Sequence, residues 1–176
     1  MRSVPCLSMR MPWIEAIFTC APPKLIENRV WNTHYRGPIL LQVSLSRTDA
    51  YYDAAHRFMR SVGIEPPVTP PMCFGRVMGR AHIVDVIPKL RWTDDSYGIV
   101  EGEQIAARYG VDPRWWFREP NEKGKFQYGF VLQHVERFEQ WPECKGTQNL
   151  FKVDAAVVRD VWRPNEHYQA LTTEGP

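Results

Sequence analysis

The chain has few cysteines and histidines, and they are scattered. Its 176 residues include four cysteines and five histidines, with no CxxC pair and no histidines at metal-ligand spacing. A structural zinc site needs closely spaced thiolate or imidazole ligands, and a disulfide framework belongs to secreted chains. The sequence therefore predicts no metal site, no disulfide scaffold and no other cofactor.

Long apolar runs are also missing. The first twenty residues do not have the architecture of a signal peptide, because Arg10, Pro12 and Glu15 interrupt them. No apolar stretch elsewhere reaches the length of about 20 residues that a transmembrane helix needs. We therefore expect a cytoplasmic protein with reduced cysteines and no membrane partner.

No single sign of charge dominates the sequence. The formal net charge of +2 is too small to indicate nucleic-acid binding through bulk electrostatics. Residues 1–45 nevertheless carry five basic side chains and two acidic ones. This local excess is either an ordinary solvated face or a basic patch.

Hydrophobic patterning predicts more strands than helices in a single domain. Helical patterns follow a short N-terminal lead and cover residues 12–23, 48–63 and 101–110, whereas extended patterns cover residues 25–31, 37–45, 73–88, 125–138 and 149–154. This order favours an α+β domain with a small mixed or antiparallel sheet, closed or strongly curved, beside its helices. We place the domain at residues 1–155. Residues 156–176 are more polar, and we expect them to form an extension with one turn of helix or strand at its start.

One polar stretch stands directly before a buried strand. Residues 26–37, "IENRVWNTHYRG", combine an acid, amides, two arginines and two large aromatics. The apolar run "PILLQVS" follows at once. Burial of that strand would fix one side of the stretch and leave the polar groups of the other side in position for a ligand.

The same stretch belongs to a longer motif. A Pro-Trp helix, a K-x-x-E-x-R segment, W-x-T-x-Y-R-G and an apolar strand that ends in serine follow one another. This order resembles the N-terminal signature of the ASCH domain family, within the PUA-like superfamily. The likeness covers about residues 7–155 and includes "GRVMGRAHIVDV" and the closing "YGFVLQHVERFEQWPECKGTQNLFKV". The matching residues are Pro12, Trp13, Lys24, Glu27, Arg29, Trp31, Thr33, Tyr35, Arg36, Gly37 and Ser44.

The resemblance implies a PUA-like fold, a mixed or antiparallel β-barrel of about five or six strands with flanking helices and a basic cleft. It also implies work on nucleic acid, chiefly RNA or modified bases. Some members of the family hydrolyse the acetyl amide of N4-acetylcytidine, and others are described as ribonucleases.

We interpret the cleft first as a binding site for RNA, single-stranded nucleic acid or a modified nucleoside. Lys24 and Arg36 would hold phosphate, an aromatic ring would stack on a base, and Asn28 or Ser44 would contact its edge. Core packing is the favoured interpretation for Trp13 and Trp31, with base stacking as the alternative. A structural ion pair with Lys24 or Arg29 is the favoured role of Glu27, with general base as the alternative. The candidate binding residues are Trp13, Lys24, Asn28, Arg29, Trp31, Tyr35, Arg36, Ser44 and Tyr128.

Two other functions remain open. In a hydrolase, Lys24 would be the activated amine and Glu27 the acid or base, assisted by Tyr128 or Ser44. Glu27, however, stands where the acetylcytidine-hydrolysing members carry a threonine, which favours binding over catalysis. In a protein-interaction scaffold, the segment "RWWFRE" at residues 114–119 would be the docking surface, although packing on the domain is the favoured interpretation of its tryptophans.

Overall fold

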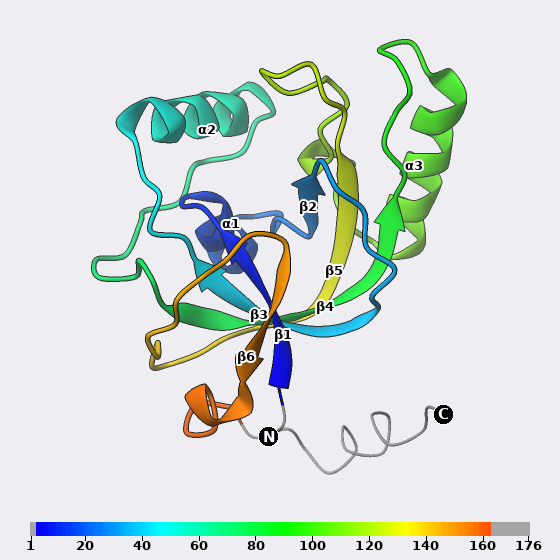
Figure 1. The fold of residues 1–176 in the computed structure, drawn as a ribbon. Helices are drawn as coiled ribbons and strands as arrows, with labels where there is room; N and C mark the ends of the chain where they lie inside the picture. The colour runs from blue at the N-terminus through cyan, green and yellow to red at the C-terminus, as the bar shows by residue number, and fades with distance from the viewer. Residues whose placement is uncertain (1–2, 163–176) are drawn as a thin grey trace, which may run out of the picture.

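The computed structural model describes residues 3–162, which form one curved sheet and three α-helices (Figure 1). The strands are β1 (Ser3–Met9), β2 (Ile26–Arg29), β3 (Gly37–Val43), β4 (Val77–Ile87), β5 (Tyr128–Arg137) and β6 (Leu150–Asp154). The helices are α1 (Trp13–Thr19), α2 (Asp49–Ser61) and α3 (Ser96–Arg108), with single 3-10 turns η1 (Pro113–Trp115) and η2 (Ala155–Val157). The expected α+β class is confirmed.

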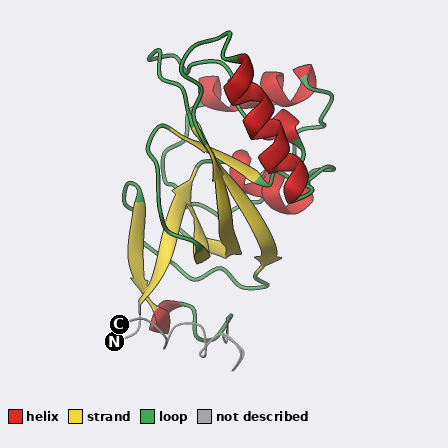
Figure 2. Ribbon diagram, turned by 90° about the vertical axis from the view of Figure 1, so that its right-hand side faces the viewer, coloured by secondary structure: helices red, strands yellow, loops and turns green. Residues whose placement is uncertain are grey.

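The six strands form one mixed sheet in the order β2-β5-β4-β3-β1-β6. β1 and β3 run parallel, and the other neighbours are antiparallel. The three α-helices gather at one end of the sheet, and η2 lies at the other (Figure 2). The loops at the helical end therefore lie close to the helices.

The expected closure of this sheet into a barrel is not seen. β2 and β6 are its edge strands in the described part of the chain. β2 has four residues and pairs with β5 alone, so no backbone ladder joins it to β1 or β6. The sheet is strongly curved instead (Figure 1).

The helices begin where their capping residues stand. Thr48 caps α2 by accepting a hydrogen bond from the Tyr51 amide at 3.3 Å. α3 begins at Ser96, five residues before the expected start, because the buried Asp95 side chain accepts from the Gly98 amide at 3.0 Å. Such a cap lies outside the apolar pattern, so periodicity alone places the start too late.

Gly79 allows β4 and β5 to approach closely. A Cβ atom on this residue would lie 2.2 Å from the Glu136 carbonyl oxygen and 2.8 Å from the ring of Phe18. A glycine inside a strand commonly marks such a close approach of two backbones.

The core includes the tryptophan pair expected to pack on the domain. Trp115 is 0% and Trp116 is 3% exposed, and both lie in a cluster with residues of α3, β4 and β5. Trp115 Nε1 donates to the Pro22 carbonyl at 3.2 Å. The packing interpretation is confirmed, because both rings are almost completely buried.

β1 differs from the expectation of a short lead before Pro12. Ser3–Met9 forms an inner strand between β3 and β6. Cys6, Leu7 and Met9 are buried. The apolar residues were a usable signal, although Pro5 and Ser8 interrupt them.

The described start of the C-terminal extension packs against the sheet. Val158 and Trp162 are buried in a cluster with Cys6, Leu40 and Val77. Residues 156–162 thus share the core of the domain. The rest of the extension expected at 156–176 lies outside the described residues.

The structure also shows the state of the cysteines, the grouping of possible metal ligands and the character of the helices. All four cysteines are free thiols. Within residues 3–162, no group of three or more histidine, cysteine or acidic side chains is arranged to hold a metal ion. The same residues contain no helix with the length and apolar character needed to cross a bilayer.

Gly102→Ala tests how tightly α3 packs on the tryptophan pair. A Cβ atom here would lie 2.3 Å from the Trp116 ring and 2.9 Å from Ile87. At an exposed helical site this change stabilises by about 0.5–1 kcal/mol. Here we expect the sign to reverse, with a loss of about 1–3 kcal/mol from overpacking. Denaturant unfolding measures the difference.

The control for this change is Gln104→Ala, at an exposed position of the same helix. Its effect on the free energy of unfolding should stay within about 0.5 kcal/mol. A stabilising effect of Gly102→Ala would show that α3 does not pack against Trp116 as described.

Candidate functional site

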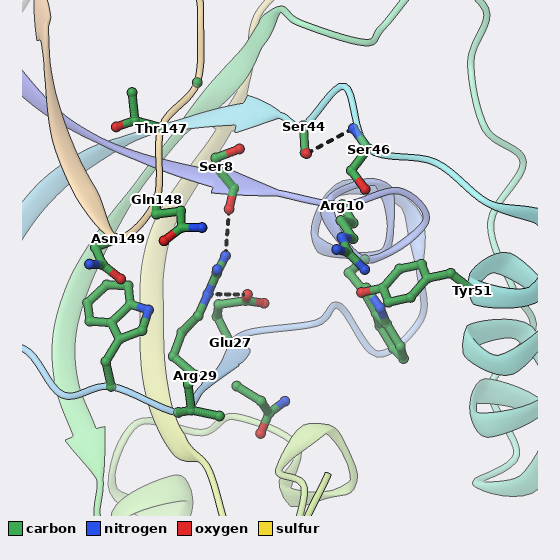
Figure 3. Close-up of a pocket in the computed structure, with 15 residues that line it drawn as sticks. Ser8, Arg10, Glu27, Arg29, Ser44, Ser46, Tyr51, Thr147, Gln148 and Asn149 are labelled. Atoms are coloured by element: carbon green, nitrogen blue, oxygen red, sulfur yellow. Dashed lines mark hydrogen bonds and ion pairs between the residues drawn. The ribbon is translucent and has the colours of Figure 1, made fainter. Parts of the chain in front are cut away.

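A polar pocket of about 650 Å³ lies between the edge strand β2 and the end of β1 (Figure 3). We call it the seam pocket, because it opens where the sheet fails to close. Its walls come from β1, β2, the end of β3, the start of α2 and the loop before β6. The lining residues are Ser8, Arg10, Trp13, Glu27, Asn28, Arg29, Val30, Trp31, Ser44, Ser46, Tyr51, Gly146, Thr147, Gln148 and Asn149.

Arg29 spans the seam with its side chain. Its Nη2 donates to the Ser8 carbonyl oxygen at 2.7 Å (Figure 3). The ladder between β6 and β1 ends at the pair Leu7–Leu150, so Ser8 lies just beyond it. A guanidinium from β2 thus bonds β1 where β6 no longer does.

Glu27 lies between two cations of the same segment. Its Oε2 forms an ion pair with Lys24 Nζ, and its Oε1 lies 2.9 Å from Arg29 Nε. The Arg29 contact is an ion pair without hydrogen-bond alignment. Lys24 also donates to the Ile26 carbonyl at 2.9 Å and is only 1% exposed. The Glu27 carboxylate therefore fixes the orientation of both side chains.

This cluster leaves Glu27 ionised. Burial acts to raise the pKa of Glu27, but Lys24 and Arg29 outweigh it and hold the pKa below its ordinary value. Burial lowers the pKa of Lys24, and Arg29 adds to that effect, although Glu27 opposes it. Glu27 is thus a carboxylate at neutral pH, with no proton to donate and both oxygens occupied.

Arg10 is the cation of the pocket that lacks an acidic partner. Its guanidinium lies 4.6 Å from the centre of the Tyr51 ring, and Arg10 is exposed. None of the ion pairs among residues 3–162 includes it. Stacking on an aromatic face orients a guanidinium without neutralising it. Arg10 can therefore receive an anionic group.

Tyr51 is held protonated. Burial raises the pKa of its hydroxyl, Glu27 adds to this effect, and Arg10 only partly opposes it. The phenol is consequently a neutral hydrogen-bonding group across the working pH range.

Two tryptophans supply aromatic surface to the pocket. Trp31 packs edge-on against Phe130, with ring centres 5.1 Å apart. Trp13 packs edge-on against Phe58 and Phe117. Both remain partly exposed, so each serves the core and the pocket wall together.

A buried glutamine supports the loop on the far side of the pocket. Gln42 is 1% exposed, and its Nε2 donates to the carbonyls of Val43 and Cys144 at 2.7 and 3.1 Å. A Cβ atom on Gly146 would lie 2.3 Å from Gln42 Oε1. The loop can pack this closely against the Gln42 side chain only because residue 146 is glycine, which has no Cβ atom.

Six of the residues expected from sequence line the seam pocket. The polar atoms of two of them, Glu27 and Asn28, already bond to neighbouring residues. Asn28 lines the pocket, but its side chain donates to the Trp115 carbonyl at 2.8 Å and accepts from the Phe117 amide at 2.9 Å. Ser44 lines the pocket and accepts from the Ser46 amide at 3.1 Å. The six are Trp13, Glu27, Asn28, Arg29, Trp31 and Ser44.

Lys24, Tyr35, Arg36 and Tyr128 are not among the lining residues. Lys24 is buried beneath Glu27, so the expected phosphate contact does not fit its position. Tyr35 donates to the Pro38 carbonyl at 2.8 Å and packs over its own loop. Arg36 donates to backbone carbonyls of that loop, and Tyr128 lies against Lys89.

Sequence reasoning missed Ser8, Arg10, Tyr51 and the loop Gly146–Asn149. Arg10 follows the unrecognised strand β1, which positions it. Tyr51 stands in a helix that was recognised, but its direction depends on how α2 packs. The loop residues have no pattern of their own, and Gln42 and Gly146 place them through a contact between distant parts of the chain.

Comparison with known proteins adds no relative. The chain matches no protein-family model, and no curated protein matches it. The likeness to the ASCH family therefore rests on the sequence motifs quoted above.

Glu27→Gln should destabilise the fold most strongly at neutral pH. The change leaves two cations near a neutral amide, and loss of one partner of a buried pair costs about 3–5 kcal/mol. Because the pKa of Glu27 is lowered in the folded state, its stabilisation is present above the ordinary glutamate value of 4.5 and is lost as the pH falls through the lowered pKa.

The measurement is the free energy of unfolding of both proteins between pH 7 and pH 3. The difference between wild type and Glu27→Gln should shrink below about pH 4. Glu122→Gln, at an exposed carboxylate, is the control and should show no comparable difference. A Glu27→Gln effect that is small and independent of pH would contradict the described cluster.

Proposed function

We propose that the seam pocket binds a single-stranded nucleic acid, RNA or a strand with a modified nucleotide, and that the chain is an ASCH domain protein. The observation that supports this proposal most directly is Arg10, an exposed cation without an acidic partner among the described residues, at the rim of a pocket with partly exposed tryptophans. Phosphate, base plane and base edge are the three features of a nucleotide that such groups recognise.

The neutral polar groups of the pocket suit the edges of a base. Hydroxyl and amide side chains from β1, from the segment after β3 and from the loop before β6 face one volume. They donate and accept hydrogen bonds without carrying charge. Trp31 provides a ring on which a base can stack, and base–aromatic stacking does not depend on base identity.

A PUA-like barrel remains our proposal for the fold. The curved sheet has its edge strand β2 bonded to β1 through Arg29 rather than through a backbone ladder. A barrel with an open seam at this point would carry its cleft where the seam pocket lies. The motif resemblance supports that interpretation.

Binding fits the pocket better than hydrolysis. The described lining residues include no imidazole, thiol or amine. Glu27 stays ionised and paired, and Lys24 is buried behind it. A hydrolase would need a group that can exchange a proton near neutral pH. The scaffold alternative is weakened because Trp115 and Trp116 are buried.

Arg10→Ala should weaken binding of labelled random-sequence single-stranded RNA by about 1.5–3 kcal/mol, the size of a hydrogen bond to a charged group. Fluorescence anisotropy at several salt concentrations measures the affinity. The slope of log affinity against log salt concentration should also become shallower by about 1, the change expected when one phosphate contact is lost. Chromatography of the RNA after incubation should show intact ligand.

Arg36→Ala is the matched control, since Arg36 is exposed but lies outside the pocket lining. It should leave the affinity within about twofold, as expected for a surface change away from the contact. Absence of salt-sensitive binding by the wild type would contradict the proposal. Degraded RNA, or equal losses in both variants, would also count against the assigned pocket.

A further inference from the structure

A second hollow, of about 600 Å³, lies between the end of α2 and the segment that follows η1. We call it the aromatic groove. Its walls include Phe58 and Val62 of the α2 side and Trp116, Phe117 and Pro120 of the other side, with Gln127 at one edge. The groove is mainly apolar, unlike the seam pocket.

The two hollows share a wall of aromatic rings. Trp13 lines the seam pocket, whereas Phe58 and Phe117 line the groove. The ring centres of Trp13 lie 5.8 Å from Phe58 and 5.5 Å from Phe117, and those two lie 4.7 Å apart. All three residues are partly exposed. One layer of side chains therefore separates the seam pocket from the groove.

Asn28 ties this wall to the edge strand. It lines the seam pocket and bonds the backbone at Trp115 and Phe117. The segment that carries Phe117 is thus held against β2. The spacing between the pocket and the groove is fixed by the fold.

The two arginines that line the groove are already paired, whereas Glu119, which also lines it, has no ion pair among residues 3–162. Arg114 Nη2 lies 2.8 Å from Asp112, and Arg118 Nη2 lies 2.8 Å from Glu103. Arg118 also lies over the Trp116 ring, 5.3 Å from its centre. The groove consequently suits a flat, uncharged group, while Arg10 in the seam pocket suits an anion. Adjacent nucleotides present this combination, since each joins a flat base to a phosphate.

We propose that the aromatic groove is a second base-binding subsite. A strand with one nucleotide in the seam pocket crosses the rim formed by Trp13 and Phe117, and the base of an adjacent nucleotide lies against Phe58 and Phe117. Proteins that bind single strands stack successive bases on successive aromatic side chains. This inference rests on the proposed function of the seam pocket. It adds that the domain binds two adjacent nucleotides of the strand rather than one.

The test compares a mixture of the four ribonucleoside 5′-monophosphates with short random-sequence RNA. One stacked base corresponds to a gain in affinity of about fivefold or more. The wild-type protein should bind the short RNA at least about fivefold more tightly than the monophosphates. Gln127→Trp, which fills the groove from its edge, should lose the gain and leave monophosphate binding unchanged. Val62→Trp is a second blocking variant, in case the first does not fold.

Val68→Trp is the matched control, because Val68 is 88% exposed and does not line the groove. It should keep the full gain. RNA with a photoreactive base should also crosslink to the peptide that contains Phe117 in wild type and not in Gln127→Trp. A retained gain in both blocking variants would overturn the subsite.

The outcomes separate this inference from the proposed function. If neither RNA nor monophosphate binds, the proposed function fails and the subsite with it. If binding depends on Arg10 but the blocking variants change nothing, the seam pocket stands and the subsite is wrong. If sedimentation shows self-association that Gln127→Trp abolishes, a second copy of the chain occupies the groove, which also overturns the proposal.

Discussion

Glu27 holds Lys24 with one carboxylate oxygen and Arg29 with the other. This arrangement lets a nearly inaccessible lysine just before β2 and a partly buried arginine at the end of β2 lie close together, because the carboxylate offsets part of the cost of burying both charges. It also directs the Arg29 guanidinium across the seam to the Ser8 carbonyl. The width of the seam, and with it the pocket, depends on this cluster.

The same cluster determines what the pocket can do. A carboxylate that is paired with two cations is unavailable for proton transfer, and a lysine buried behind it is unavailable to a ligand. The chemistry left to the pocket comes from its rim, where Arg10 is charged and Tyr51, the serines and the amides are neutral. Such a site is suited to recognition, in which charge, ring surface and hydrogen bonds each meet a different part of the ligand.

Aromatic side chains connect the seam pocket to the core. Trp13 contacts rings from α2 and from the segment after η1, so three distant parts of the sequence meet at the wall of the pocket. Asn28 adds the edge strand to that junction. A ligand at the rim would therefore contact a surface whose rigidity derives from core packing rather than from loop structure.

The sequence by itself determined most of the elements and several members of the site. Apolar periodicity marked the helices at α1 and α2 and the strands β3, β4 and β5, because those faces must be buried. Within the polar stretch at residues 26–37, Glu27, Arg29 and Trp31 line the seam pocket. The tertiary structure decided which cations face the ligand volume. Lys24 and Arg36 are as basic as Arg10 in sequence, but Lys24 is buried and Arg36 forms an ion pair with Asp85 of β4 at 3.6 Å. Both features depend on contacts across the fold. The formation of β1 was also decided by the tertiary structure. Its apolar stretch is short and interrupted, so local propensity alone does not predict a strand there, and pairing with β3 and β6 stabilises it.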